Sequence, residues 1–268
     1  MDIASIFGLI VAICAIAFGY TMDGGNLRAL WLLSALIIVV GGSAGSVAIS
    51  YGINELKKMP GLLLQAFRQP KSSIPKTLEF LVTLAEHARK DGLLSLEKLL
   101  NTHDPKSPVD PLLKRGMLMV IDGADLEQIR DLMETDIAIF EERSKNEIST
   151  FDSFGGYAPA YGMVGTIMGL IQALANMESP EAMAASIAVA FVTTFYGVII
   201  ANMICLPASS KLRNRLRNNV LEKEMIVDGV CAIRNGQNPK LLRSKLSSYL
   251  TSEAKLLKKT AAEKGGKK

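Results

Sequence analysis

Two long apolar runs without a charged residue dominate the second half of the chain. They cover residues 155–177 and 182–206, and a short acidic link from Glu178 to Glu181 joins them. A helix rises about 1.5 Å per residue, so each run is long enough to cross the roughly 30 Å hydrocarbon core of a membrane. The pattern predicts a membrane hairpin of two helices.

Two further uncharged runs open the chain. The first, Ile3 to Tyr20, lacks the basic start and small-residue cleavage site of a signal peptide, so we expect a retained membrane helix. A turn from Thr21 to Asn26 leads to the second run, Ala29 to Tyr51, with Trp31 near its outer end. The predicted fold class is an all-α polytopic membrane protein with four transmembrane helices and a helical cytoplasmic domain.

Basic residues fall in two blocks, which sets the expected orientation. Arg28 is the only Lys or Arg before Lys57, and none lies between Lys145 and Lys211. Because basic segments stay on the cytoplasmic side of a membrane, both large polar segments and both termini are expected in the cytoplasm. We divide the chain into membrane helices 1 and 2 (1–51), a cytoplasmic helical domain (52–153), membrane helices 3 and 4 (154–206) and cytoplasmic helices with a basic tail (207–268).

Capping signals predict the helices of the cytoplasmic segments. Ser72 or Ser73 is expected to cap a helix with Pro75 in its first turn, and Gly92 ends that helix. Three further helices are expected, one starting at Asp110-Pro111 and stopping at Gly123, a long charged one from Asp125 to Glu147, and one opening at Asn238-Pro239.

Small and hydroxyl-bearing residues form one stripe along each helix of the hairpin. The stripes are Gly162, Thr166, Gly169, Ala173 and Asn176 in the first helix, and Ser186, Ala190, Thr193, Gly197 and Ala201 in the second, with Thr194 beside it. Such faces let membrane helices pack closely, and they can also line a polar pathway. Pro159 lies near the start of the first run, and Pro207 lies just past the end of the second. A proline in a helix removes one backbone hydrogen-bond donor. Packing alone and a polar pathway both remain open.

Ionisable groups are missing from all four predicted spans. A cation carrier normally places at least one such group at membrane depth, so any carboxylate on an ion path must come from another chain. Three cysteines and two histidines have neither metal-ligand nor disulfide spacing, and the net charge of +4 is too small to indicate nucleic acid binding. We therefore expect no enzyme, no metal site and no cofactor, but a partner whose membrane helix bears an acid.

One stretch of the cytoplasmic domain is denser in charge than its surroundings. It runs from Glu86 to Asp91 and resumes at Glu97 and Lys98, across the break at Gly92. Charges on a turn between amphipathic helices usually form a solvated face. The alternative is a docking surface that steers and registers a partner through complementary charges.

Several motifs in order resemble the MotA/PomA stator subunits of the bacterial flagellar motor. They are APAYGMVGTIMGLI from Ala158, AVAFVTTFYG ending at Gly197, AEHARKDGLLSLE ending at Glu97, and IDGAD ending at Asp125. The resemblance covers nearly the whole chain. The related TolQ/ExbB proteins share the last two membrane helices but have three spans, which fits this sequence less well.

The resemblance implies partners and site residues. It implies a ring of five copies in the bacterial inner membrane, around a MotB-type single-span subunit that supplies the ion-binding Asp. Pro159 and Pro207 match prolines that couple ion flow to conformational change, and Arg89, Lys90 and Glu97 match charges that engage the rotor protein FliG. Thr166, Thr193 and Thr194 match hydroxyls near the ion site of the sodium-driven branch.

The transported cation is therefore expected to be a proton or sodium, with sodium favoured. Partly dehydrated sodium needs several oxygen ligands, which threonine hydroxyls, a freed carbonyl and the partner's Asp could supply. Threonines also occur in membrane helices only to bond the preceding turn, which leaves the proton open. Two other functions stay open at this point, a TolQ/ExbB-type energiser of an envelope partner and a passive membrane scaffold.

Overall fold

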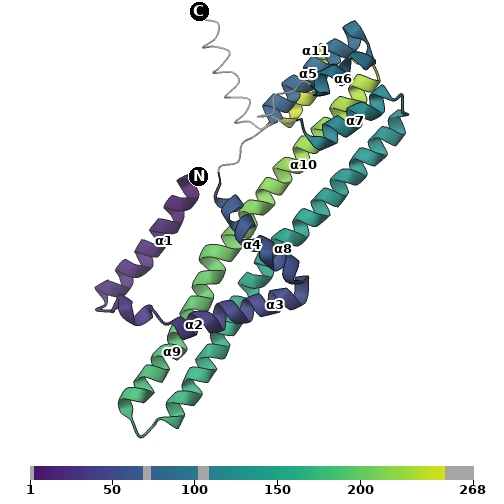
Figure 1. Ribbon diagram of the computed structural model, residues 1–268. Coiled ribbons are helices and arrows are strands. Elements are labelled where there is room, and N and C mark those ends of the chain that lie inside the picture. Colours follow the sequence, from purple (N-terminus) through teal and green to yellow (C-terminus); the bar gives the residue numbers. More distant parts are fainter. Residues whose placement is uncertain (1–2, 69–73, 102–108, 251–268) are drawn as a thin grey trace, which may run out of the picture. The chain divides into compact units, whose positions relative to one another are not determined.

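The protein is mainly helical in the part that the structure describes, which is residues 3–68, 74–101 and 109–250 of a computed structural model (Figure 1). No strand occurs among those residues, and the predicted all-α class is confirmed. The chain forms two compact units. One contains residues 1–70 and 144–215 and is called the membrane unit below, and the second unit contains residues 71–143 and 216–268.

Apolar helices long enough to cross a membrane lie at three places in the described residues. They are Leu27–Tyr51, the helix Leu126–Ala175 and the stretch Pro180–Arg234. A shorter apolar stretch, Ile6–Met22, belongs to the first helix, α1 (Ile3–Met22). This count is consistent with the four predicted spans.

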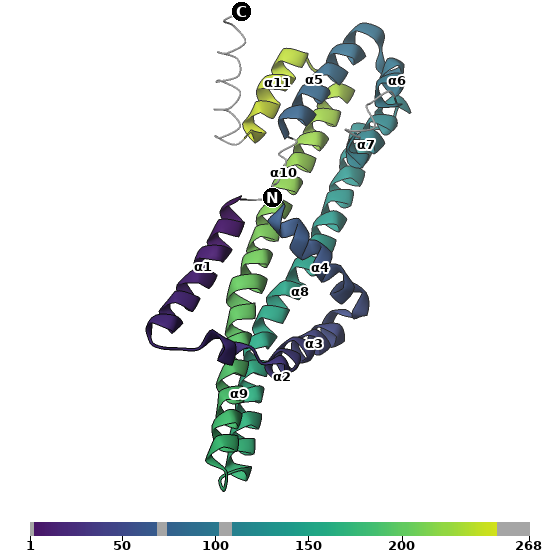
Figure 2. The same ribbon diagram turned by 60° about the vertical axis from the view of Figure 1, so that its left-hand side comes forward.

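The predicted hairpin consists of two helices that run side by side in both ribbon views (Figures 1 and 2). The first is the end of α8 (Leu126–Ala175), which continues the predicted charged helix without a break. The second is α9 (Pro180–Ile199), whose Ser179 side chain accepts a hydrogen bond from the amide of Ala182. A π-helical segment, η4 (Ile200–Cys205), joins α9 to α10 (Leu206–Arg234), so the helix passes through Pro207.

The second span is less regular than the sequence predicts. It begins with a 3₁₀ turn, η1 (Leu27–Leu30), and the backbone is extended at the next two residues, Trp31 and Leu32. Helix then runs through α2 (Leu33–Leu36), the π-helical segment η2 (Ile37–Gly41) and α3 (Gly42–Tyr51). The predicted span Ala29 to Tyr51 therefore agrees with the apolar stretch Leu27–Tyr51, but extended backbone at Trp31 and Leu32 interrupts its helix.

A tyrosine from α9 satisfies the polar backbone of this extended link. The Tyr196 hydroxyl donates to the Leu30 carbonyl at 2.7 Å, and the Leu32 amide donates to the same hydroxyl at 3.3 Å. Extended backbone in an apolar environment otherwise leaves donors and acceptors unsatisfied, which costs several kcal/mol per group.

An amphipathic helix follows the second span, within the segment predicted to be helical, although its bounds were not predicted. Gly52 has a φ of 85°, and α4 (Ile53–Phe67) follows it. The Arg215 guanidinium donates to the carbonyls of Gln65, Ala66 and Arg68 and so caps the end of α4. Lys57 and Lys58 are exposed on α4, whereas Met59 and Ala66 are buried.

The second unit forms from helices whose caps follow the predicted signals. Asp110 caps α7 (Pro111–Ile121), and Asn238 caps α11 (Pro239–Leu246). The helix α5 (Ile74–Asp91) ends before Gly92, which has a φ of 82°. Three short helical segments complete the unit: η3 (Leu93–Ser95), α6 (Leu96–Asn101) and η5 (Ser247–Tyr249). The predicted cap at Ser72 or Ser73 and His103 lie outside the described residues.

Large apolar side chains fill the core of the second unit. The fully buried ones include Leu78, Leu81, Leu84, Leu96, Leu113, Met117, Ile129, Met133, Met225, Ile226, Leu242 and Leu246. Because α5, α7, α10 and α11 all contribute to this list, one shared core holds segments that are far apart in sequence.

Candidate functional site

The two predicted stripes of small residues meet along the seam between α8 and α9. A methyl group added at Gly169 would lie 2.7 Å from the Ala190 Cβ, and one added at Gly162 would lie 3.1 Å from the Thr194 Cα. At Gly197 it would lie only 2.5 Å from the Ala158 carbonyl oxygen. These positions allow backbone to approach backbone, which is how helices associate in lipid.

Two hydroxyls face each other across this seam. Thr166 Oγ1 lies within hydrogen-bond distance of the Gly162 carbonyl (3.1 Å) and the Ala190 carbonyl (3.0 Å), and it also contacts Thr194 Oγ1. Thr194 Oγ1 in turn lies 3.2 Å from the Gly162 carbonyl. Four oxygens therefore gather at one point, and both hydroxyls are partly exposed.

Thr193 has a different environment, although it was predicted beside the other two threonines. Its hydroxyl donates to the Val189 carbonyl of its own helix at 2.6 Å, and the residue is completely buried. A methyl group added at Gly165 would overlap the Thr193 Cγ2, so Thr193 packs where α8 has no side chain. The structure thus separates Thr193 from the oxygen cluster.

Both predicted prolines lie within continuous helix. Pro159 is inside α8 and has no N–H to donate to the Gly155 carbonyl one turn earlier. On the facing helix, a methyl group added at Gly197 would lie 3.1 Å from the Pro159 Cα, so α9 packs directly against the proline turn. Pro207 is exposed in the first turn of α10 and directly follows the π-helical segment η4.

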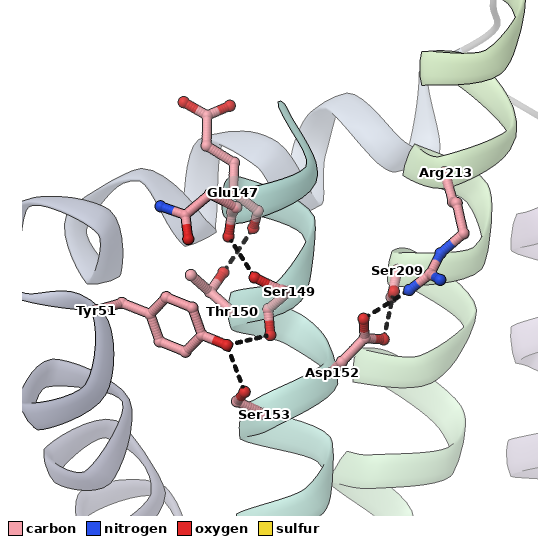
Figure 3. A network of polar contacts seen from close by, with 9 residues as sticks. Tyr51, Glu147, Ser149, Thr150, Asp152, Ser153, Ser209 and Arg213 are labelled. Atoms are coloured by element: carbon pink, nitrogen blue, oxygen red, sulfur yellow. Dashed lines mark hydrogen bonds and ion pairs between the residues drawn. The ribbon is translucent and has the colours of Figure 1, made fainter. Parts of the chain in front are cut away.

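A polar network lies at the end of the hairpin where charges begin (Figure 3). Ser209 donates to Asp152 at 2.5 Å, and Arg213 forms an ion pair with the same carboxylate at 2.7 Å, which joins α8 to α10. Lys58 pairs with Glu55 at 2.9 Å and Glu147 at 3.0 Å. Hydrogen bonds to these two carboxylates raise the pKa of Lys58.

Tyrosine–serine pairs hold α3 against α8. Tyr161 and Ser46 hydroxyls lie 2.9 Å apart, Tyr157 and Ser50 lie 3.2 Å apart, and Tyr51 and Ser153 lie 2.8 Å apart. Sequence analysis missed this ladder. The signal was present, since serines at 46 and 50 are four residues apart, as are tyrosines at 157 and 161.

The predicted docking charges are exposed on the second unit. Arg89 and Lys90 lie in the last turn of α5, and Glu97 lies in the first turn of α6. Gly92 and the 3₁₀ turn η3 separate the two groups. Within residues 74–101 and 109–250, no ion pair or hydrogen bond engages these three side chains.

The described residues contain no group of three or more His, Cys, Asp or Glu side chains that could hold a metal ion. His87 instead lies 3.3 Å from Asp91 on the same helix. Cys231 is buried in the second unit, and this burial raises the pKa of its thiol.

Comparisons with known proteins cover almost the whole chain. Residues 104–225 match the MotA/TolQ/ExbB proton channel family, and residues 6–92 match the motility protein A N-terminal family. Motility protein A of Borreliella burgdorferi is 38% identical over 251 residues, which are 94% of this chain and 95% of the relative. Chemotaxis protein PomA of Vibrio alginolyticus is 33% identical over 262 residues, 96% of this chain and 98% of the relative.

Comparison with solved structures indicates the same group of proteins. The structure of C. jejuni MotAB matches with a TM-score of 0.85 and 32% identity, covering 94% of this chain and 97% of that one. The flagellar MotAB stator complex of Bacillus subtilis matches with a TM-score of 0.83 and 31% identity, with the same coverage. The chain therefore belongs to the MotA/TolQ/ExbB proton channel family, and within it to the group of motility protein A.

Proposed function

We propose that this chain is the motor subunit of a flagellar stator, which forms a cation channel with a MotB-type partner and converts ion flow into torque. The observation that carries this proposal is the α8/α9 seam, where backbone and hydroxyl oxygens gather at Thr166 and Thr194 while residues 155–177 and 182–206 contain no Asp, Glu, Lys, Arg or His. The likeness to motility protein A and to MotAB structures supports the same function.

The partner supplies the acid that this chain lacks at membrane depth. Its carboxylate takes up the cation, and the loss of charge lets the ring of five copies step around the partner's helices. A unit charge crossing a membrane at 100 mV releases about 2.3 kcal/mol, several times the thermal energy. Both termini lie in the cytoplasm, and the protein resides in the bacterial inner membrane.

Reconstitution into vesicles tests this division of labour. We expect ion flux only when the chain is co-reconstituted with its single-span partner, and loss of flux when the partner's membrane Asp is changed to Asn. Flux from this chain alone would overturn the proposal. A partner that binds peptidoglycan supports a stator, whereas a partner without such a domain supports a TolQ/ExbB-type energiser.

Sodium is the proposed ion, because the oxygen cluster at Thr166 and Thr194 offers the ligands that hard cations prefer. Replacing sodium by potassium at constant ionic strength should then stop flux and swimming. Thr166→Val and Thr194→Val keep the side-chain shape and should reduce sodium flux at least about tenfold. Thr193→Val is the matched control, since the Thr193 hydroxyl bonds within its own helix. Undiminished torque in potassium would show that the ion is a proton.

Torque reaches the rotor through the exposed charges Arg89, Lys90 and Glu97, which engage the rotor protein FliG. Arg89→Glu and Glu97→Lys should each reduce swimming strongly without reducing assembly, because both side chains are exposed. Lys76→Glu is the matched control, since Lys76 is an exposed cation at the other end of α5. Normal swimming in both single reversals and in the double reversal would refute the docking role.

A further inference from the structure

The last charged residue of α8, Asp152, bonds to α10 through two side chains. Its carboxylate accepts a hydrogen bond from the Ser209 hydroxyl at 2.5 Å and pairs with the Arg213 guanidinium at 2.7 Å (Figure 3). Ser209 is only 2% exposed, so water has little access to its hydroxyl. Asp152, Ser209 and Arg213 are called the α8/α10 bridge below.

The α8/α10 bridge continues the face of α8 that forms the seam. Asp152, Gly155, Gly162 and Gly169 follow one another at steps of three or seven residues, so they lie on one side of the helix. A methyl group added at Gly155 would lie 3.3 Å from the Cys205 Cβ, so α8 packs closely against η4 one turn from the bridge. Small residues let the backbones approach along this face, and charged side chains then join the two helices at its end.

Both predicted prolines lie on the hairpin side of the α8/α10 bridge. Pro159 is seven residues from Asp152, about 10 Å along α8, and Pro207 is two residues before Ser209. Pro159 lacks an N–H, and the π-helical segment η4 directly precedes α10. Prolines and π-bulges are the places where long helices bend. A bend at either place would move both helices beyond it, because the bridge joins them there.

The ion pair of the α8/α10 bridge is too exposed to contribute much to folding. The Arg213 side chain is 66% exposed and that of Asp152 is 39% exposed. Water and salt screen such pairs, and the side chains lose conformational freedom when they pair, so the gain in stability is small. A role in positioning the two helices therefore accounts for this pair better than a role in stability.

We propose that the α8/α10 bridge couples ion flow to torque, because it makes α8 and α10 move together when the proline turns bend. Its residues act by position, since Asp152 lies about 21 Å along α8 from the oxygen cluster at Thr166. The inference rests on the proposed stator function, because torque is the output that it explains.

The test measures ion flux and swimming separately, with the full-length chain and its single-span partner. Asp152→Asn keeps the size of the side chain and removes its charge, and Arg213→Gln removes the cation. We expect each variant to assemble on native gels and to keep the ion flux of the original protein in vesicles. Each should reduce swimming speed at least about threefold, since residues that link two sites change their coupling by about this much.

Restoring the charges separates a positioning role from the loss of a side chain. Arg213→Lys keeps a cation and should swim nearly as well as the original protein. Asp152→Arg combined with Arg213→Asp should swim faster than Asp152→Arg alone, because only the exchange restores a pair of opposite charges.

Two exposed cations provide matched controls. Lys58 pairs with Glu147 of α8 at 3.0 Å, but it joins α8 to α4 and not to α10. Arg217 is exposed one turn beyond Arg213 on α10. Lys58→Gln and Arg217→Gln should leave swimming unchanged, since no contact between α8 and α10 that the structure describes depends on either cation.

Four results would overturn the inference. Normal swimming in both Asp152→Asn and Arg213→Gln would show that coupling does not need the bridge. Loss of flux together with swimming would assign both residues to the ion path or to assembly. An equal loss of swimming in Arg217→Gln would assign the effect to general surface charge. These three results would leave the stator proposal standing, whereas absence of flux from the original chain and its partner would overturn both.

Discussion

The seam between α8 and α9 and the core of the second unit are packed by opposite means. The seam brings glycine, alanine and threonine together until backbones touch, whereas the core buries leucine, isoleucine and methionine side chains. In water, removal of large apolar surfaces drives packing, at about 25 cal/mol per Å². In lipid that force is absent between helices, so close approach and hydrogen bonds must hold them together. Burial of large side chains therefore stabilises the second unit, whereas close backbone approach stabilises the seam.

The strongest test of this contrast enlarges a residue in the seam. Gly197→Leu should block assembly and swimming, because even the first added carbon would lie 2.5 Å from the Ala158 carbonyl oxygen. We expect at least about tenfold less assembled complex, since overpacking costs roughly 1–3 kcal/mol and more against backbone. Gly45→Leu, where an added carbon meets no atom within 4 Å, should assemble normally on native gels.

Truncation should have the next largest effect, and only in the second unit. Leu81→Ala removes a completely buried side chain that packs on Gly229, and should cost about 2–5 kcal/mol. Hydrogen exchange of the full-length protein should then accelerate in α5 and α10. Leu94→Ala, at a residue 76% exposed, should leave exchange unchanged. Equal exchange in the two variants would contradict a core held by large side chains.

Alkaline pH should weaken the second unit through Tyr249. Burial, followed by its hydrogen bond to Asp228 at 3.0 Å, raises the pKa of this tyrosine to about 12. The unfolded tyrosine loses its proton near pH 10 and the folded one near pH 12, so stability present below pH 10 declines between these values. At pH 11 we expect a loss of about 1 kcal/mol, allowing for partial exposure.

Tyr249→Phe isolates that effect. The variant lacks the titrating hydroxyl, so its hydrogen exchange in α10 and α11 should depend less on pH between 10 and 12 than that of the original protein. Identical pH dependence in both proteins would assign the alkaline loss to other groups.

The smallest effect should come from the polar ladder in the membrane. Tyr161→Phe removes the hydrogen bond to Ser46 and should cost about 0.6 kcal/mol, the average for such bonds between membrane helices. A double-mutant cycle with Ser46→Ala, read by resistance to denaturing detergent, isolates the pair. A coupling energy near zero would show that close packing alone holds α3 to α8.

Periodicity made much of this arrangement predictable from sequence. Helical repeats of three and four residues place Gly162 and Gly169 on one face, and that face packs against Ala190 and Gly197 as expected. Capping chemistry was equally local, so the starts of α7 and α11 at Pro111 and Pro239 followed from the preceding Asp110 and Asn238.

Features that depend on partners distant in sequence were not predictable. The helix α4 ends where Arg215, about 150 residues away, reaches its carbonyls. Likewise, Thr193 and Thr194 are neighbours in sequence, but helix rotation sends one hydroxyl into its own turn and the other toward Thr166. The π-helical segments η2 and η4 were not predictable either, because their residues are typical of ordinary membrane helices.

The bond between Tyr196 and the link at residues 30–32 constrains how this protein can evolve. The Tyr196 hydroxyl satisfies two backbone groups of this link. It donates a hydrogen bond to the Leu30 carbonyl and accepts one from the Leu32 amide. Replacing Tyr196 by phenylalanine would leave the Leu30 carbonyl and the Leu32 amide without this partner. We therefore expect loss of the phenol to be tolerated best where residues 30–32 form a regular helix, whose own backbone hydrogen bonds would satisfy both groups.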